Sequence, residues 1–229
     1  MKKLPVRVLL IGAAGRMGQT VRDLASTDSE IEIVALCDLD DPIQPAMKNC
    51  DVAIDFSHAD AITGICRAAL HDHKPLVIGT TGHSQAQRQM IDDAAKSLPI
   101  VLASNFSVGV NVLFFLTHKA AELLGQDFHP EIIETHHKMK KEAPSGTAKT
   151  LAEVLKTAQK IESEIPIQSV REGDVVGEHT VIFSGPGERL ELTHRASSRE
   201  IFARGALRSA KWIMGRPPGL YSMQDVVGL

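Results

Sequence analysis

The sequence of 229 residues predicts an α/β fold in which a doubly wound parallel sheet is followed by a second α+β domain with a mixed, largely antiparallel sheet. The first observation is that, up to residue 105, short apolar runs alternate with segments whose apolar residues recur at helical spacing. The second is that the later strand-like runs follow one another without helices between them and are separated by glycines. The architecture is therefore expected to change near residue 105.

The expected elements of the first part alternate in type. Each strand is a short apolar run, and each helix has an apolar residue every three or four positions. The strands are expected at 6–11, 31–37, 51–57, 74–79 and 99–103, and the helices after residue 15, at 58–71 and at 84–96. Such alternation implies parallel strands with ligands at their carboxyl ends. Two polar segments fall at such ends, Gly79-Thr80-Thr81-Gly82 and Ala103-Ser104-Asn105-Phe106.

The second part begins with a long apolar helix, expected over 110–124. A strand at 131–134 and a helix that opens at Ser145 come next, and further strands are expected at 167–170, 179–184 and 189–194. Turns are expected at Gly173, Gly177 and Gly185-Pro186-Gly187. A final helix near 202–214 is expected to pack back on the first domain.

A glycine-rich turn follows the first strand directly. Gly12, Gly15 and Gly18 have the spacing Gly-x-x-Gly-x-x-Gly and open a helix, which is a variant of the dinucleotide-binding fingerprint. The first glycine suits the tight turn, the second admits the pyrophosphate, and the third lets the helix pack on the strand. Glycines alone would also fit an ordinary turn, but here the strand, the helix and a downstream acid are in register. The first domain is therefore expected to be of the Rossmann type.

Asp38 is that downstream acid. It ends the second strand about 20 residues after Gly18, where the fingerprint places a carboxylate for the ribose hydroxyls. Leu39 follows it. Because a carboxylate repels a 2′-phosphate and a leucine cannot neutralise one, we predict that NADH is the preferred cofactor and that NADPH is possible.

The segment from Glu134 to Ala148 contains two imidazoles, three ammonium groups and a Ser-Gly-Thr helix start. With Ser145 as N-cap, the amides of Gly146 and Thr147 belong to a first helical turn, whose donors bind carboxylate or phosphate. Lys140 can add a full positive charge. The segment therefore predicts a clamp for an anionic substrate.

Two other interpretations of this segment compete with the clamp. In one, His136 and His137 are a surface pair and the lysines form a solvated face. In the other, the histidines bind zinc, but the His-Glu-x-x-His spacing is missing, and Cys37, Cys50 and Cys66 show no Cys-x-x-Cys pattern. We therefore expect no metal.

Composition excludes several classes of protein. A net charge of −3 gives no overall basic field for nucleic acid, so no nucleic-acid partner is expected. No stretch is long enough to cross a membrane. Three unpatterned cysteines suit a reducing compartment, so a cytoplasmic location is expected.

These motifs occur together and in the same order in one known family. Over almost its whole length the chain resembles the dihydrodipicolinate reductases, also called 4-hydroxy-tetrahydrodipicolinate reductases, of the bacterial and plant diaminopimelate and lysine pathway. The segments that resemble the family are 12–18, 77–82, 105–111, 136–148, 177–180 and 188–199.

The resemblance implies a dinucleotide-binding domain at 1–106 and 204–229, and a substrate-binding and oligomerisation domain at 107–203. It further implies hinge closure and a homotetramer. His136 and Lys140 would form the proton-transfer pair, and His137, Gly146 and Thr147 would bind substrate. The implied cofactor contacts are Gly12, Ala13, Ala14, Gly15, Arg16, Met17, Asp38, Gly79, Thr80, Thr81, Ala103, Ser104, Asn105 and Phe106.

The implied reaction is reduction of (2S,4S)-4-hydroxy-2,3,4,5-tetrahydrodipicolinate to (S)-2,3,4,5-tetrahydrodipicolinate with NAD(P)H and loss of water. Hydride addition at C4 of the conjugated imine leaves negative charge that a nearby acid must quench. Lys140 could be that acid or a carboxylate anchor. The alternatives are a related reductase for another small dicarboxylate or amino acid, and an NADH-binding regulator, which would not need a proton donor beside a carboxylate site.

The chain departs from the usual family pattern in three places. Leu39 replaces a basic residue, and Glu142 stands where aspartate is usual. The segment between Asp38 and Asp51 is short, so a connecting element is expected to be trimmed there. Three further polar residues, His179, His194 and Arg195, are expected to have structural roles.

Overall fold

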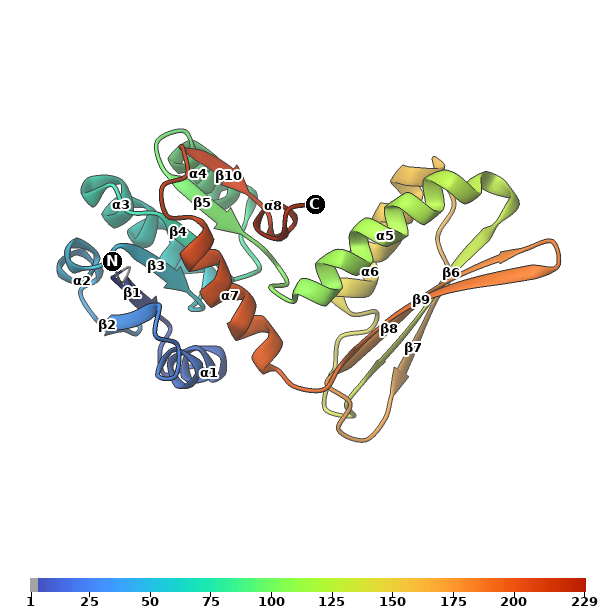
Figure 1. Ribbon diagram of the computed structural model, residues 1–229, viewed down its shortest axis with the longest axis horizontal. Helices are drawn as coiled ribbons and strands as arrows, with labels where there is room; N and C mark the ends of the chain where they lie inside the picture. Colours follow the sequence, from blue (N-terminus) through green and yellow to red (C-terminus); the bar gives the residue numbers. More distant parts are fainter. Residues whose placement is uncertain (1–3) are drawn as a thin grey trace. The chain divides into compact units, whose positions relative to one another are not determined.

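The computed structural model describes residues 4–229 and consists of two units (Figure 1). The first unit runs to Ser107 and resumes over Glu200–Gly228, and the second holds Val108–Arg199. The first three residues of the expected nucleotide domain lie outside the described part. The boundary expected after residue 203 falls inside a helix, and the units divide at the start of that helix instead. Within residues 4–229, no helix is both long and apolar enough to cross a membrane.

The first unit is built on a six-stranded parallel sheet with the order β10-β5-β4-β3-β1-β2. Its strands are β1 (Val6–Ile11), β2 (Ile31–Cys37), β3 (Val52–Asp55), β4 (Leu76–Ile78), β5 (Pro99–Leu102) and β10 (Gly219–Tyr221). The strand order reverses at β1, which has β2 on one side and β3 on the other. Ligands of such sheets bind beyond the carboxyl ends of the strands at this switch point.

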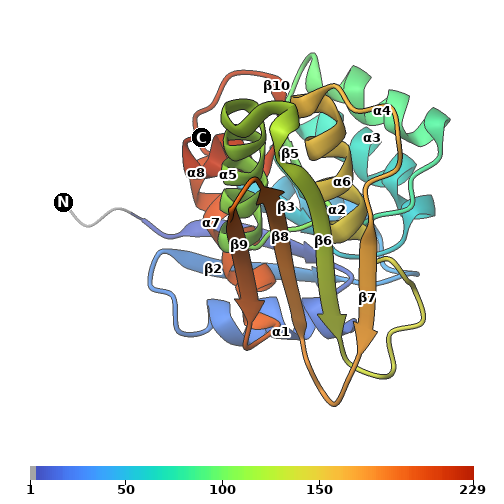
Figure 2. The ribbon, with the colours of Figure 1, turned by 90° about the vertical axis from the view of Figure 1, so that its right-hand side faces the viewer.

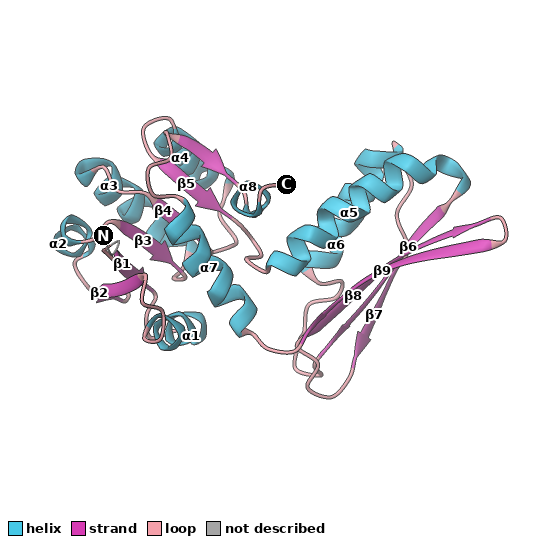
Figure 3. Cartoon of the chain, in the orientation of Figure 1, coloured by secondary structure: helices cyan, strands magenta, loops and turns pink. Residues whose placement is uncertain are grey.

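Helices cover both faces of this sheet (Figure 3). They are α1 (Arg16–Ala25), α2 (Ile43–Asn49), α3 (Ile62–Asp72), α4 (Gln85–Ala95), α7 (Glu200–Trp212) and α8 (Met223–Val227), with a short 3-10 turn, η1 (Ala59–Ala61), before α3. Leu9 and Ile11 pack in a core with α2, α3 and α4. Val8 and Leu10, also buried, point to the opposite face because side chains alternate along a strand. The sequence therefore shows continuous apolar strands, as a sheet covered on both faces requires.

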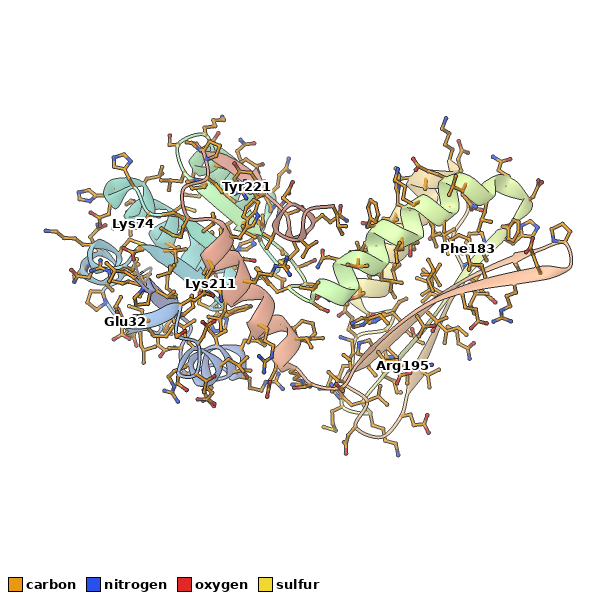
Figure 4. The ribbon with its side chains drawn as sticks, in the orientation of Figure 1. Glu32, Lys74, Phe183, Arg195, Lys211 and Tyr221 are labelled. Atoms are coloured by element: carbon orange, nitrogen blue, oxygen red, sulfur yellow. The ribbon has the colours of Figure 1, made fainter. Side chains whose placement is uncertain are left out.

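The helix α7 returns to this sheet, as its apolar face predicted. It contacts α1, β1, β3 and β4. Lys211 on α7 donates to Asp28 at 3.0 Å and to Glu30 at 2.9 Å, two residues in the turn before β2 (Figure 4). Three elements were not expected from the sequence: β10, α8 and the seven-residue α2, which occupies the short segment after Asp38.

The second unit is a four-stranded mixed sheet with helices on one face (Figure 2). Its strands, in the order β7-β6-β8-β9, are β6 (His129–His136), β7 (Ile167–Arg171), β8 (Gly177–Gly185) and β9 (Glu188–Ala196). β7 is parallel to β6, whereas β8 and β9 are antiparallel to their neighbours, as predicted. Gly177, expected in a turn, is instead the first residue of β8.

The core of this unit lies between the sheet and two helices, α5 (Val108–Leu124) and α6 (Gly146–Gln159); a short 3-10 turn, η2 (Gly125–Asp127), follows α5. Phe183 on β8 and Ile132 on β6 are buried there with Leu151 of α6 (Figure 4). Pro130, Ile132, Glu134 and His136 alternate with more exposed residues along β6, so all four face the helices. This inward face is apolar at its start and ionisable at its carboxyl end.

Candidate active site

The glycine turn after β1 is closely packed. Gly12 has φ of +80°, and a Cβ there would lie 2.4 Å from the carbonyl oxygen of Phe56. A Cβ on Gly18 would lie 2.2 Å from the carbonyl oxygen of Gly12. Gly15 is the N-cap residue of α1 and supplies no side chain there, so the first turn of this helix has no side-chain cap. The start of α1 thus presents first-turn backbone donors, which is the arrangement that binds phosphate.

Asp38 lies directly against this turn. Its Oδ1 and Oδ2 accept from the backbone N–H of Ala14, at 3.0 and 3.2 Å. A cavity of about 810 Å³ adjoins it, large enough for a nucleoside. The lining residues are Ile11, Gly12, Ala14, Gly15, Asp38, Leu39, Ile43, Phe56, Ser57, His58, Asp60, Ala61 and Gly64. This lining contains two carboxylates and neither Lys nor Arg.

The remaining sequence-predicted cofactor residues of this unit lie at the same sheet edge. Gly79 follows β4 beneath the ring of Phe56, to which a Cβ would come within 2.2 Å. A cavity of about 410 Å³ brings together Arg16, Met17, Gly79, Thr80 and Thr81. Thr80 and Thr81 also line a cavity of about 520 Å³ with Ser104. Phe106 packs edge-on against Phe56, with ring centroids 5.8 Å apart.

In the second unit, the sequence-predicted His136 is buried at the end of β6. Its Nδ1 is hydrogen-bonded to Oε2 of Glu134, which is fully buried. Burial opposes ionisation of Glu134, but hydrogen bonds from Arg171, Ser169 and His136 outweigh it and lower the pKa of this carboxyl to about 2. An ionised carboxylate only accepts, so Nδ1 carries the hydrogen and donates.

The pKa of His136 is lowered, first by burial and then by the positive charges of Lys140 and Arg171, while Glu134 opposes the shift. The ring is therefore biased toward its neutral form, with Nδ1 protonated and Nε2 able to accept a proton. Nε2 lies beside the start of β8, where a Cβ on Gly177 would come within 3.1 Å of it.

Lys140 lies in the loop between β6 and α6. Its side chain is about three-quarters buried, and Nζ is 3.7 Å from Oε2 of Glu142. Glu142 also pairs with Lys149 of α6 at 2.9 Å. Glu142, the residue that departs from the family pattern, therefore forms ion pairs with both Lys140 in the loop and Lys149 on α6.

Ser145 begins α6 as predicted. Its Oγ accepts from the backbone N–H of Ala148 at 3.2 Å, and its own N–H donates to Glu134 at 3.3 Å. A Cβ added to Gly146 would meet no protein atom within 4 Å, so the space in front of the helix start is open. Gly146 and Thr147 thus provide first-turn amides beside His136, in the arrangement that binds a carboxylate.

His137 points to a different group from His136. Its Nε2 is 3.1 Å from Nη2 of Arg199, at the end of the second unit. The structure therefore brings His136, Lys140 and the α6 start together around Glu134, while His137 pairs with an arginine.

Sequence reasoning missed Glu134, Arg171 and His179 as members of this cluster. Glu134 could have been found, because it precedes His136 by two residues on a strand and so shares its face. His179 is buried opposite Glu134 in the β6–β8 register, and its Nε2 is 3.1 Å from the Ser145 hydroxyl. Two other residues for which the sequence predicted structural roles lie outside this cluster. His194 packs against Gly109, and the exposed Arg195 pairs with Glu178 at 3.2 Å (Figure 4).

Glu134, His136 and His179 offer possible metal-ligand atoms within 4.8 Å of one another. However, Arg171 donates to both oxygens of Glu134, at 2.8 and 3.0 Å. A metal ion would have to displace this guanidinium and the His136 proton. The geometry therefore favours a carboxylate–imidazole pair over a metal centre.

The comparisons with known proteins agree with these motifs. The family model described as dihydrodipicolinate reductase, N-terminus, matches residues 6–106, and the one described as dihydrodipicolinate reductase, C-terminus, matches residues 109–227. The C-terminal match therefore includes α7, β10 and α8, which belong to the first structural unit.

Curated relatives match the chain over nearly its full length. A 4-hydroxy-tetrahydrodipicolinate reductase of Akkermansia muciniphila is 49% identical, with 98% of each chain covered. One from Aquifex aeolicus is 40% identical, covering 99% of this chain and 100% of the relative.

Among solved structures, a dipicolinate-bound dihydrodipicolinate reductase from Paenisporosarcina sp. TG-14 has a TM-score of 0.83 and 25% identity, covering 96% of this chain and 98% of that one. A diaminopimelate dehydrogenase of C. glutamicum, with a TM-score of 0.59 and 11% identity, shares the fold alone. Two family models that together match most of the chain, and relatives this similar over their whole length, show that the chain belongs to the dihydrodipicolinate reductase family.

Proposed function

We propose that this chain reduces (2S,4S)-4-hydroxy-2,3,4,5-tetrahydrodipicolinate to (S)-2,3,4,5-tetrahydrodipicolinate, with loss of water, in diaminopimelate and lysine biosynthesis. The family consists of NAD(P)H-dependent oxidoreductases of this activity, and the curated relatives bear its name. The observation that best supports the proposal is the buried His136, held by Glu134 beside Lys140 and the start of α6. This cluster combines a proton-transfer group with a carboxylate site.

The residues of the second unit would bind and protonate the substrate. The amides of Gly146 and Thr147 would receive one carboxylate of the ring, with His137 as a further ligand. His136 and Lys140 would be the proton-transfer pair, because a proton must reach the ring after hydride adds to C4. His136 can pass a proton through Nε2 while Glu134 fixes Nδ1.

The first unit fits a nicotinamide dinucleotide, which supplies the hydride when bound. The first-turn amides of Arg16 and Met17 would hold its pyrophosphate beside the turn formed by Gly12, Ala13, Ala14 and Gly15, and Gly79, Thr80, Thr81, Ala103, Ser104, Asn105 and Phe106 would line its nicotinamide side. Asp38 would accept from the ribose hydroxyls at the cavity beside the glycine turn.

NADH should be preferred over NADPH. The carboxylate of Asp38 is fixed by Ala14, and the same cavity is lined by Asp60 and Leu39. A 2′-phosphate would meet negative charge with no neutralising side chain among the residues that line the cavity.

A homotetramer is the assembly that we propose. The α5 and α6 helices cover one face of the second unit's sheet, and within residues 4–229 no helix of this unit covers the other face. Light scattering would show a tetramer, and a monomer at working concentration would contradict this assignment.

The reaction is tested by following NADH oxidation while dihydrodipicolinate synthase forms the substrate in place from aspartate semialdehyde and pyruvate. Turnover that requires all three additions supports the proposal, whereas NADH binding without turnover contradicts it. His136→Ala and Lys140→Ala should each lower kcat by about 100-fold or more if proton transfer limits the rate. Near-normal kcat in both variants would remove the pair from the mechanism.

A further inference from the structure

Arg171, to which the proposed reaction assigns no role, donates hydrogen bonds to Glu134 and to three backbone carbonyl oxygens. It ends β7, directly opposite His136 in the β6–β7 register. Its Nη1 and Nη2 donate to the two carboxylate oxygens of Glu134, at 3.0 and 2.8 Å. Such a bidentate contact fixes the plane of the carboxylate and stabilises its negative charge.

The same guanidinium also holds the loop between β6 and α6. Nε donates to the carbonyl oxygen of Lys140 at 3.2 Å, and Nη2 donates to that of Glu142 at 2.6 Å. A further bond from Nη1 reaches the carbonyl of Val170 at 2.7 Å. All three nitrogens of the guanidinium are therefore used, and the side chain is only one-fifth exposed.

We propose that Arg171 is a positioning residue for both members of the proton-transfer pair, His136 and Lys140. It acts on His136 through the carboxylate of Glu134, and on Lys140 through a backbone carbonyl. This inference rests on the proposed function, since it assigns a purpose to the same site.

For His136, the consequence is a fixed tautomer. The guanidinium keeps Glu134 ionised, so the carboxylate must receive a hydrogen from Nδ1 and the proton transferred in the reaction must pass through Nε2. For Lys140, the consequence is a fixed backbone, which limits where Nζ can lie. Errors of about 1 Å in such positions can cost about 100-fold in rate.

Charge reinforces this arrangement. The groups that face His136 are Glu134 on its own strand, Lys140 in the loop, Arg171 on β7 and His179 on β8. Burial lowers the pKa of His136 most, Glu134 raises it, and the positive charges of Lys140 and, last, Arg171 lower it further. Removing the guanidinium should therefore let the ring take up its proton at higher pH.

The test compares Arg171→Ala and Arg171→Lys with a control, Arg189→Ala. Arg189 also pairs with a glutamate, Glu191, at 2.8 Å, but it is half-exposed on β9. The first readout is the ¹⁵N NMR titration of the His136 ring in the substrate-free protein, assigned with His136→Gln. The second is kcat and KM with NADH and the enzymatically generated substrate, with and without added guanidinium ion.

We expect Arg171→Ala to move the His136 titration to higher pH, to weaken the preference for protonated Nδ1, and to lower kcat by at least about tenfold with a smaller change in KM. Guanidinium ion should restore part of kcat in Arg171→Ala and none in Arg171→Lys, whose single ammonium cannot replace the bidentate contact. Arg189→Ala should leave all readouts unchanged.

A wild-type His136 titration and tautomer in folded Arg171→Ala would overturn the inference, whatever the activity. If the alanine variant does not fold, Arg171→Lys decides: wild-type tautomer and kcat in that variant would equally overturn it. If the wild-type protein shows no turnover at all, the proposed reaction fails, while the NMR comparison still tests the network.

Discussion

Leu39→Arg is predicted to shift cofactor use toward NADPH, and the size of the effect can be worked out from the cavity beside Asp38. The carboxylate is held by the backbone N–H of Ala14 at 3.0 and 3.2 Å, so it cannot swing away from a 2′-phosphate. An oxygen within hydrogen-bond distance of this carboxylate places a phosphorus at about 5 Å. A phosphate with about two negative charges at that distance is repelled by about 2 to 3 kcal/mol, for an effective dielectric constant of about 40 to 80.

Since about 1.4 kcal/mol corresponds to a factor of ten, kcat/KM should favour NADH over NADPH by about 30- to 150-fold in the wild-type protein. The side chain at position 39 is 83% exposed, so an arginine there is well screened and should recover only about tenfold for NADPH. Leu39→Met, which adds no charge, is the matched control.

The assay is steady-state kcat/KM with each cofactor, measured at low and at physiological salt. The preference should weaken as salt is added, because exposed charges are screened. Equal use of NADH and NADPH by the wild-type protein would refute the electrostatic reasoning. So would a gain for NADPH in Leu39→Met as large as that in Leu39→Arg.

Two further predictions concern the second unit. Gly146→Ala should keep the wild-type unfolding temperature, because its Cβ meets no protein atom within 4 Å, but it should raise KM for the substrate by about tenfold by crowding the helix start; an unchanged KM would place the carboxylate elsewhere. Burial, followed by the charge of His136, lowers the pKa of His179 from 6.5 to about 4. Between these two values the unfolded protein binds more protons at this residue than the folded protein does. The contribution of His179 to the free energy of unfolding is therefore complete above pH 6.5 and is lost as the pH falls toward 4. Urea unfolding should therefore show an acid loss about 3 kcal/mol smaller in His179→Gln than in the wild-type protein, and parallel curves for the two would contradict this.

Much of the fold could be predicted because its signals are local. Apolar runs marked the strands, and the glycine turn with Asp38 marked the switch point of the first sheet. The helix α2 was missed because Pro42 and Pro45 made its segment look like a connection, although proline is tolerated in the first turn of a helix. β10 and α8 are only three and five residues long, so neither has a full period of the pattern that would indicate it.

Only part of the candidate site could be predicted from the sequence, because its residues come from segments that are far apart in the chain. His136, Lys140 and the Ser145 helix start lie within one short segment, so their proximity can be inferred from the sequence. Arg171 and His179 come from strands much later in the chain, and only the pairing register brings them to Glu134. Register is a property of the assembled sheet, since a shift of one residue would turn either side chain to the opposite face.

This register also explains how a carboxylate can be fully buried without being neutral. Along the inward face of β6, Ile132 belongs to the apolar core, and Glu134 is the next residue on the same face. Desolvation at that depth would ordinarily favour the protonated acid. The parallel neighbour β7 instead brings the Arg171 guanidinium to it, and the α6 start adds the amide of Ser145. The charge is thus stabilised by groups that also fix the loop of Lys140, so packing of the core and alignment of the proton-transfer groups depend on the same contacts.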